Sequence, residues 1–215
     1  MSYKIVVARY NENILWLKNE LHNCIIYNKG EKLPIGNVDN EIILENVGRE
    51  SETYLHYIIT NYYDLPDVVV FTQGRIYDNK GIEEGTEELK YLINIKNEAF
   101  NNLKSLNYIE IYDETNNIHF NSKWNLTNGE YFLHDNYKNN ERITFIDWFK
   151  KNININYPNP IYIYPNAIFA INKKNILKKS IEYYKKLILE LKHNIDPAEG
   201  HFFERSWYYI FTCDE

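Results

Sequence analysis

The sequence predicts one α/β domain over residues 1–215, with a mainly parallel central sheet flanked by helices. Short apolar runs alternate with helical patterns in the first third of the chain, an order typical of parallel strands joined by helices. A length of 215 residues suits one well-filled domain better than two. Hydrophobic residues make up 44% and charged residues 25%, as in globular proteins, so the chain is expected to bury a core.

The first elements follow from apolar runs and from the polar residues between them. Residues 4–8 suit a buried strand, and Asn11 or Asn13 can cap a helix whose apolar residues are Leu15, Trp16 and Leu21. A second strand is expected at 24–27, a turn at 28–30 and another extended segment at 41–44.

The segment from Asn46 to Gly74 predicts a loop, a helix at about 51–63 and a buried strand at 67–72. Gly48 permits a sharp turn, and Ser51 and Thr53 stand where side-chain oxygens can cap free amides. A helix start of this kind can receive a phosphate, although a purely structural crossover explains the same residues.

The second half predicts further helices and strands, apart from residues 113–141, which fit no element and could form a long functional loop. Helices are expected at 87–103, at 145–151 after a Thr144 cap, along one long amphipathic stretch at 176–191, and at 201–211. Extended runs are expected at 108–112, 161–164 and 167–171.

Composition and charge limit the binding partners and the cellular compartment that can be expected. A formal net charge of −6 opposes nonspecific binding to nucleic acid, so no nucleic-acid partner is expected. The lysines between 173 and 186 fit the solvated face of a helix, with a phosphate- or membrane-binding patch as the alternative. Cys24 and Cys213 lack metal-type spacing, and no signal peptide or transmembrane segment is evident, which predicts an intracellular, cytoplasmic protein.

Glu204 is the strongest catalytic candidate, because aromatic neighbours in Gly200-His-Phe-Phe-Glu-Arg-Ser-Trp207 can raise the pKa of a carboxyl group toward general-base values. An ordinary ion pair is the alternative. Arg9, Asn11 and Glu12 follow the first strand, where they can read a nucleotide or simply cap a helix. Arg49 suits a diphosphate, or a pair with a nearby glutamate.

Several common active-site motifs are missing from the sequence. It has no P-loop, no dinucleotide-binding glycine motif and no Gly-x-Ser-x-Gly elbow, which disfavours kinases, dehydrogenases and serine hydrolases. The six histidines are scattered, and His201 with Glu204 gives only an isolated three-residue spacing, so no metal site is predicted.

Six stretches spread along the chain form one recognisable set. They are Val6-Val-Ala-Arg-Tyr-Asn-Glu12, Tyr27-Asn-Lys-Gly30, Asn46-Val-Gly-Arg-Glu50 with Tyr54-Leu55, Val70-Phe71 with Gln73-Gly74, Ala167-Ile-Phe-Ala-Ile171, and Glu204-Arg-Ser-Trp207 with Ile210-Phe211. Together they resemble a little-characterised family of fungal and giant-virus proteins that looks like the GT-A nucleotide-sugar glycosyltransferases. The resemblance implies a GT-A-like fold, a nucleotide-sugar donor, with a UDP-sugar favoured, and a glycan, protein or small-molecule acceptor. A viral member would act in the host cytoplasm.

The resemblance also implies roles for single residues. Arg9, Asn11 and Glu12 would lie at the nucleotide end, Arg49 and Glu50 near the diphosphate, Gln73 and Gly74 in the donor-sugar region, and Glu204 near the acceptor. Thr72-Gln73-Gly74 lacks the carboxylates of the Asp-x-Asp motif that binds a divalent cation in such enzymes. Either Asp78 substitutes, or Arg49, a helix start and Lys29 stabilise the leaving diphosphate without metal.

Two hypotheses follow. The first is a glycosyltransferase in which Glu204 deprotonates an acceptor hydroxyl. The second is a catalytically inactive GT-A-like module that binds glycans or proteins, since the cation motif is missing and the region around 113–141 is rich in aromatic residues.

Overall fold

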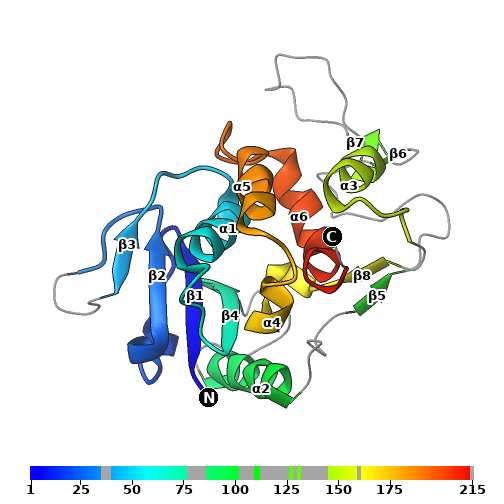
Figure 1. Ribbon diagram of the computed structural model, residues 1–215. Coiled ribbons are helices and arrows are strands. Elements are labelled where there is room, and N and C mark those ends of the chain that lie inside the picture. The colour runs from blue at the N-terminus through cyan, green and yellow to red at the C-terminus, as the bar shows by residue number, and fades with distance from the viewer. Residues whose placement is uncertain are drawn as a thin grey trace.

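The computed structural model describes residues 1–34, 40–76, 86–101, 109–111, 126–127, 130–131, 145–158 and 161–213 (Figure 1). Its centre is a five-stranded sheet with the order β3-β2-β1-β4-β9. The strands are β1 (Tyr3–Arg9), β2 (Cys24–Asn28), β3 (Glu41–Ile43), β4 (Val68–Gln73) and β9 (Phe169–Asn172). The first four are mutually parallel, and β9 pairs antiparallel with β4. The prediction of a mainly parallel sheet in an α/β fold is therefore confirmed.

Helices cover both faces of this sheet because its central strands bury side chains on both sides. Val69 and Phe71 of β4 belong to one hydrophobic cluster, and Val68 and Val70 belong to the other, as the alternation of a strand requires. The larger cluster includes residues of α1 (Arg49–Asn61), α3 (Phe145–Ile153), α5 (Ile181–Leu189) and α6 (Ala198–Thr212). The smaller includes residues of α2 (Thr86–Asn101). Figure 1 shows α1 and α2 at different sides of the sheet.

Two short antiparallel pairs accompany the main sheet. One joins β5 (Ile109–Ile111) to β8 (Ile161–Ile163), which confirms the expected extended segments there. The other joins β6 (Leu126–Thr127) to β7 (Glu130–Tyr131). The rest of the 113–141 segment and the Thr144 cap lie outside the described residues.

The prediction of a helix after the first strand is wrong. Two three-residue 3-10 turns stand there instead, η1 (Leu15–Leu17) and η2 (Leu21–Asn23). Asn13 does accept a hydrogen bond from the amide of Leu15, at 2.9 Å. However, the indole of Trp16 donates to the carbonyl of Gly74 at 2.9 Å. Tertiary contacts thus take precedence over the local helical pattern.

The long helix expected at 176–191 is also wrong, because it is divided. A short helix, α4 (Lys173–Ile176), ends before Ser180, whose backbone is extended and whose hydroxyl accepts from the amide of Tyr183 at the start of α5. A new N-cap therefore begins a second helix within one continuous apolar pattern. Lys179 lies beside this cap and is buried, so it is not on the solvated lysine face.

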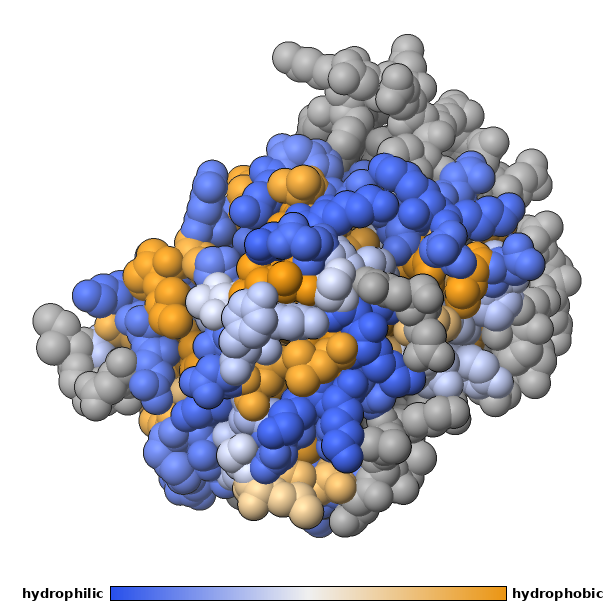
Figure 2. All heavy atoms as spheres, viewed as in Figure 1, coloured by the Kyte–Doolittle hydropathy of each residue, from blue (hydrophilic) through white to orange (hydrophobic). Residues whose placement is uncertain are grey.

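The remaining expected helices are confirmed as α1, α2, α3 and α6. Between β8 and β9 the chain makes a turn, η4 (Pro165–Ala167), in which Asn166 has φ 57° and Ala167 has φ 54°. Within the described residues, no helix is long and apolar enough to cross a membrane. On the face drawn in Figure 2, hydrophobic residues form separate small patches between hydrophilic ones.

Candidate functional site

The strand order places two of the predicted site segments side by side. The strand of this sheet that follows β1 in the chain, β2, lies on one side of the β1–β4 pair, and the one that follows β4, β9, lies on the other. Open α/β sheets bind ligands at the carboxyl ends of two such strands. The amide of Gly74, after β4, donates to the carbonyl of Ala8 in β1 at 2.9 Å. A Cβ atom on Gly74 would lie 2.9 Å from a carboxylate oxygen of Glu12. Gln73 and Gly74 therefore meet the loop after β1.

In that loop, the predicted nucleotide-binding side chains contact their own chain. The guanidinium of Arg9 donates to the Asn28 side chain at 2.8 Å and to the carbonyls of Glu31 and Glu12 at 2.7 and 3.0 Å. Asn11 accepts from the amide of Glu31 at 2.7 Å. The carboxylate of Glu12 accepts from the amide of Tyr10 at 2.6 Å. Arg9, Asn11 and Glu12 thus shape the loop beside Gly74, and their contact with a nucleotide remains a prediction.

The start of α1 is a strained turn. Gly48 and Arg49 both have left-handed backbones, with φ 65° and φ 53°. The amide of Gly48 donates to the carbonyl of Asn194 at 2.9 Å. Among the described residues the N-cap makes no side-chain hydrogen bond, so the caps expected from Ser51 and Thr53 are wrong; both residues are fully buried inside the first turns. The amide of Glu50 donates to the carboxylate of its own side chain, and the neighbouring first-turn amides have no side-chain cap in the described part of the chain.

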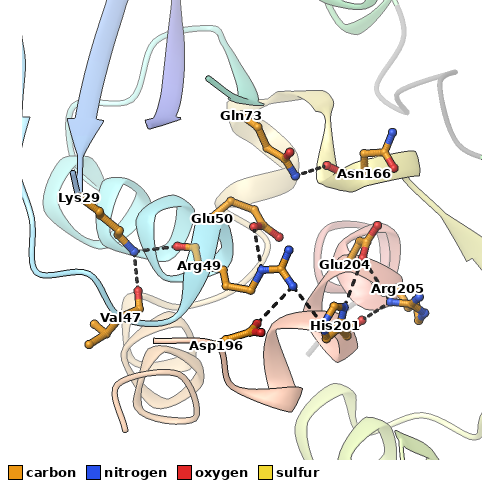
Figure 3. Close-up of polar contacts among 10 residues, drawn as sticks. All are labelled: Lys29, Val47, Arg49, Glu50, Gln73, Asn166, Asp196, His201, Glu204 and Arg205. Carbon is orange, nitrogen blue, oxygen red and sulfur yellow. Dashed lines mark hydrogen bonds and ion pairs between the residues drawn. The ribbon is translucent and has the colours of Figure 1, made fainter. Parts of the chain in front are cut away.

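Lys29, at the end of β2, holds this turn in place (Figure 3). Its ammonium donates to the carbonyls of Val47 and Arg49 at 2.6 and 2.7 Å and lies 2.9 Å from the carboxylate of Glu52. Burial lowers the pKa of Lys29, and the Glu52 charge opposes that shift. Because an ammonium has three donors and all three have partners here, Lys29 supports the turn and does not fit direct binding to a diphosphate.

Arg49 links this turn to α6. Its guanidinium contacts the imidazole of His201 at 3.0 Å and the carboxylate of Asp196 at 3.3 Å, and its Nε lies 3.7 Å from Glu50. Burial lowers the pKa of Arg49, but the charges of Glu50, Asp196 and Glu204 outweigh it and raise the pKa overall. The side chain is 39% exposed. The cation predicted to bind a diphosphate is therefore reachable from solvent.

His201 connects Arg49 with Glu204, so the two residues chosen from distant parts of the sequence occupy one cluster (Figure 3). A guanidinium only donates hydrogen bonds, so its contact requires Nε2 of His201 to be the acceptor nitrogen. The proton of a neutral imidazole then sits on Nδ1, 3.9 Å from the Glu204 carboxylate.

Glu204 differs from the expectation in its electrostatics. Burial raises the pKa of its carboxyl group, but the imidazole of His201, whose Nδ1 lies 3.9 Å away, and the charges of Arg205 and Arg49 outweigh burial and lower the pKa overall. Arg205 Nη1 lies 3.2 Å from the carboxylate. The expected rise from aromatic neighbours is therefore wrong, because cationic and donor groups surround this carboxylate.

Glu50 is the second carboxylate of the cluster, and its side chain is only 11% exposed. Burial raises its pKa, opposed by the charge of Arg49. One turn later on α1, the hydroxyl of Tyr54 is fully buried and has no hydrogen-bond partner among the described residues. Burial and the charges of Glu50 and Glu204 raise the pKa of Tyr54 well above its ordinary value, so this hydroxyl stays protonated.

Sequence reasoning missed the roles of His201, Asp196 and Tyr54 in this cluster. The three-residue spacing of His201 and Glu204 and the four-residue spacing of Glu50 and Tyr54 place each pair on one helix face, which is the signal available in the sequence. The contacts of Arg49 with α6 depend on tertiary structure and leave no such signal.

The donor-sugar residues occupy the end of β4. The Gln73 amide donates to the carbonyl of Asn166 at 3.0 Å, while Asp78 lies outside the described residues. A hard divalent cation prefers carboxylate oxygens, and Gln73 and Gly74 supply none. Among the described residues, no group of three or more His, Cys, Asp and Glu side chains could hold a metal ion. These residues do not fit a resident cation.

A comparison with protein-family profiles identifies the family of this chain. Residues 5–215 match the profile of a family described as "Protein of unknown function (DUF3431)". The chain belongs to the DUF3431 family. A search of curated proteins and a search of solved structures each found no significant match.

Proposed function

We propose that the protein is a glycosyltransferase that moves a sugar from a nucleotide-sugar donor to an acceptor hydroxyl. One observation carries the proposal: the partly exposed cation Arg49, at the start of α1, lies in one polar cluster with the carboxylates Glu50 and Glu204. Such a reaction needs a cation for the departing diphosphate and a carboxylate for the acceptor proton. The GT-A resemblance of the sequence supports the same class.

The donor diphosphate would bind at the start of α1. The unpaired amides of a helix N-terminus carry a partial positive charge, and the Arg49 guanidinium can bind two phosphate oxygens at once. Next to this place, the loop after β1 and Gly74 form the carboxyl edge of β1 and β4, where the nucleoside would lie. Tyr10 is exposed in that loop and offers a ring for a base.

The chemical step is a displacement at the anomeric carbon. The oxygen of the acceptor hydroxyl attacks this carbon while its bond to the diphosphate oxygen breaks, and the electron pair leaves with the nucleoside diphosphate. The hydroxyl proton passes to a carboxylate of the cluster, Glu50 or Glu204. Arg49 and the α1 amides stabilise the charge of the leaving group. A single direct displacement inverts the anomeric centre.

A second candidate is a catalytically inactive GT-A-like module that binds a glycan or a protein. It is favoured by the end of β4, where Gln73 and Gly74 stand without a carboxylate and the Gln73 amide already contacts Asn166. Such a module would bind ligand without releasing nucleoside diphosphate.

The test is the release of nucleoside diphosphate from a panel of nucleotide sugars, starting with UDP-sugars and offering glycan and small-molecule acceptors. Turnover by the wild type is expected, with a loss on the order of 10²-fold in Arg49→Met, because one transition-state charge partner is removed. Lys173→Gln is the matched control, since Lys173 pairs with Asp67 at 2.9 Å at the amino end of β4.

The same proteins then separate the two candidates by thermal unfolding. A ligand that binds the folded state raises the melting temperature. Stabilisation by glycans alone, without turnover, would favour the inactive module. Lack of both turnover and stabilisation by UDP would rule out the glycosyltransferase.

A further inference from the structure

We propose that Glu50 is the catalytic base of the transfer, and that Glu204 is a positioning residue that orients His201. This inference rests on the proposed function and goes beyond it, because it divides the two carboxylates of the cluster by role. It also departs from the sequence, where Glu50 was expected only near the diphosphate.

Glu204 is held by neighbours on its own helix. Arg205 lies 3.2 Å from its carboxylate and also donates to the carbonyl of His201 at 2.8 Å. The imidazole of His201 stands between Glu204 and Arg49. A carboxylate that orients an imidazole, which in turn contacts the proposed phosphate-binding guanidinium, acts through other residues and not on the acceptor.

Glu50 is bound less tightly. Its nearest cation is the Nε of Arg49 at 3.7 Å, which exceeds hydrogen-bond length, and the carboxylate accepts from its own amide. The carboxylate is thus mostly buried without a short ion pair, and its oxygens can take a proton from a bound hydroxyl. Its pKa is raised while that of Glu204 is lowered. When environments drive two neighbouring carboxyl groups apart in this way, the group with the raised pKa suits proton transfer.

The hydroxyl of Tyr54 is a second feature that supports a ligand site near Glu50. The buried hydroxyl of Tyr54 follows Glu50 by one helical turn and has no hydrogen-bond partner among the described residues. Buried hydroxyls are normally paired, so an unpaired donor one helical turn from Glu50 indicates a place for a ligand oxygen. The titratable and charged groups around Glu50 are Arg49 and Tyr54 on α1, Lys29 at the end of β2, and His201 and Glu204 on α6.

In the transfer, the acceptor hydroxyl loses its proton to a carboxylate oxygen of Glu50 as its own oxygen bonds to the anomeric carbon. The bond from that carbon to the diphosphate breaks, and the electron pair leaves with the nucleoside diphosphate. Glu50 returns its proton to water after product release, so the enzyme is regenerated and no other reactant is consumed.

The first test is independent of activity. Glutamate side-chain carboxyls labelled with carbon-13 are titrated by NMR, and two signals are assigned from their loss in Glu50→Gln and Glu204→Gln. The Glu50 signal is expected to titrate at a higher pH than the Glu204 signal. In Glu204→Gln, the Glu50 pKa should fall, because a neighbouring negative charge has been removed. The reverse order of titration would overturn the proposal.

The second test is the pH profile of nucleotide-sugar turnover. Glu50→Gln is expected to lose 10²- to 10⁴-fold in kcat across the profile, roughly the contribution of a general base. Glu204→Gln should keep a clear acid limb, moved to lower pH with the Glu50 pKa. Glu182→Gln is the control, because Glu182 is an exposed residue paired with Lys185 on α5.

Failures of the two proposals are distinguishable. Turnover by the wild type with full activity in Glu50→Gln, or loss of the acid limb in Glu204→Gln alone, overturns the role of Glu50 and leaves the glycosyltransferase standing. Absence of turnover by the wild type overturns the glycosyltransferase and, with it, the base.

Discussion

Replacement of Tyr54 by phenylalanine should stabilise the protein while it impairs the reaction. The Tyr54 side chain is fully buried, and its hydroxyl has no hydrogen-bond partner among the described residues. Burial of a hydroxyl without a partner costs about 1–3 kcal/mol of folding free energy. Tyr54→Phe removes this group and keeps the ring that packs against Phe71 and Trp207.

The gain is reduced only slightly by the space that the oxygen leaves. A void of about 12 Å³ costs roughly 0.3 kcal/mol at about 24 cal/mol per Å³. The net stabilisation is therefore about 0.7–2.7 kcal/mol, and at about 2–4 °C per kcal/mol for a chain of this size the melting temperature should rise by roughly 1–11 °C. We expect the hydroxyl to donate to a ligand oxygen during the reaction, so kcat should fall by about 10- to 100-fold in Tyr54→Phe.

Calorimetric melting and nucleotide-sugar turnover measure the two effects separately. Tyr184→Phe is the matched control, because Tyr184 is equally buried in the same core but donates to the carbonyl of Ile176 at 2.8 Å. Loss of that bond should lower the free energy of unfolding by about 0.5–1.5 kcal/mol. Equal destabilisation by both substitutions would show that the Tyr54 hydroxyl is satisfied in the folded protein, and the reasoning would fail.

Three further predictions concern the turn and the sheet. Gly48→Ala places a Cβ 2.5 Å from the Cβ of Glu52 at φ +65°, so it should lower the free energy of unfolding by about 1–3 kcal/mol in urea titrations and weaken UDP binding; unchanged stability would contradict the strained turn. Lys29→Met should lower the free energy of unfolding by about 3–5 kcal/mol because the buried Glu52 loses its partner. The double variant with Glu52→Gln should regain part of this free energy, and no recovery would argue against the ion pair. Hydrogen bonds from Lys173 and Ser2 lower the pKa of Asp67 from 3.8 to about 2, so the ionised carboxylate stabilises the fold above pH 3.8 and this stabilisation is lost as the pH falls toward 2. Asp67→Asn should therefore reduce the fall of the melting temperature between pH 4 and pH 2. An unchanged dependence of the melting temperature on pH in this range would contradict the prediction.

The sequence predicted the sheet well because its strands are strongly apolar. Residues 4–8 and 67–72 are short apolar runs, and each became a buried central strand, β1 and β4. The pattern failed where a tertiary contact or a cap competed with periodicity. Trp16 shows the first case, since its indole reaches Gly74, and Ser180 shows the second, since its hydroxyl begins a new helix.

The candidate site was only partly predictable, for an electrostatic reason. Arg49 and Glu204 could be chosen as single residues, and the structure brings them into one cluster. The pKa of Glu204 could not be inferred from its aromatic neighbours in the sequence, because its sign depends on a competition. Burial raises it, whereas His201, Arg205 and Arg49 together lower it. His201 and Arg205 are close to Glu204 in the sequence, but the sequence does not show how their side chains are oriented.

The backbone at Gly48 and Arg49 explains why this cluster forms at all. Two consecutive left-handed residues are unfavourable, and a left-handed arginine costs on the order of 1 kcal/mol or more. The fold retains them with a buried ammonium, Lys29, on two carbonyls of the turn, at its own desolvation cost. A helix could begin more simply with a polar side chain at the N-cap, a position that Gly48 fills here. Both the left-handed turn and the buried ammonium of Lys29 lower the stability of the fold. We therefore infer that the turn is retained because it directs the Arg49 side chain toward His201.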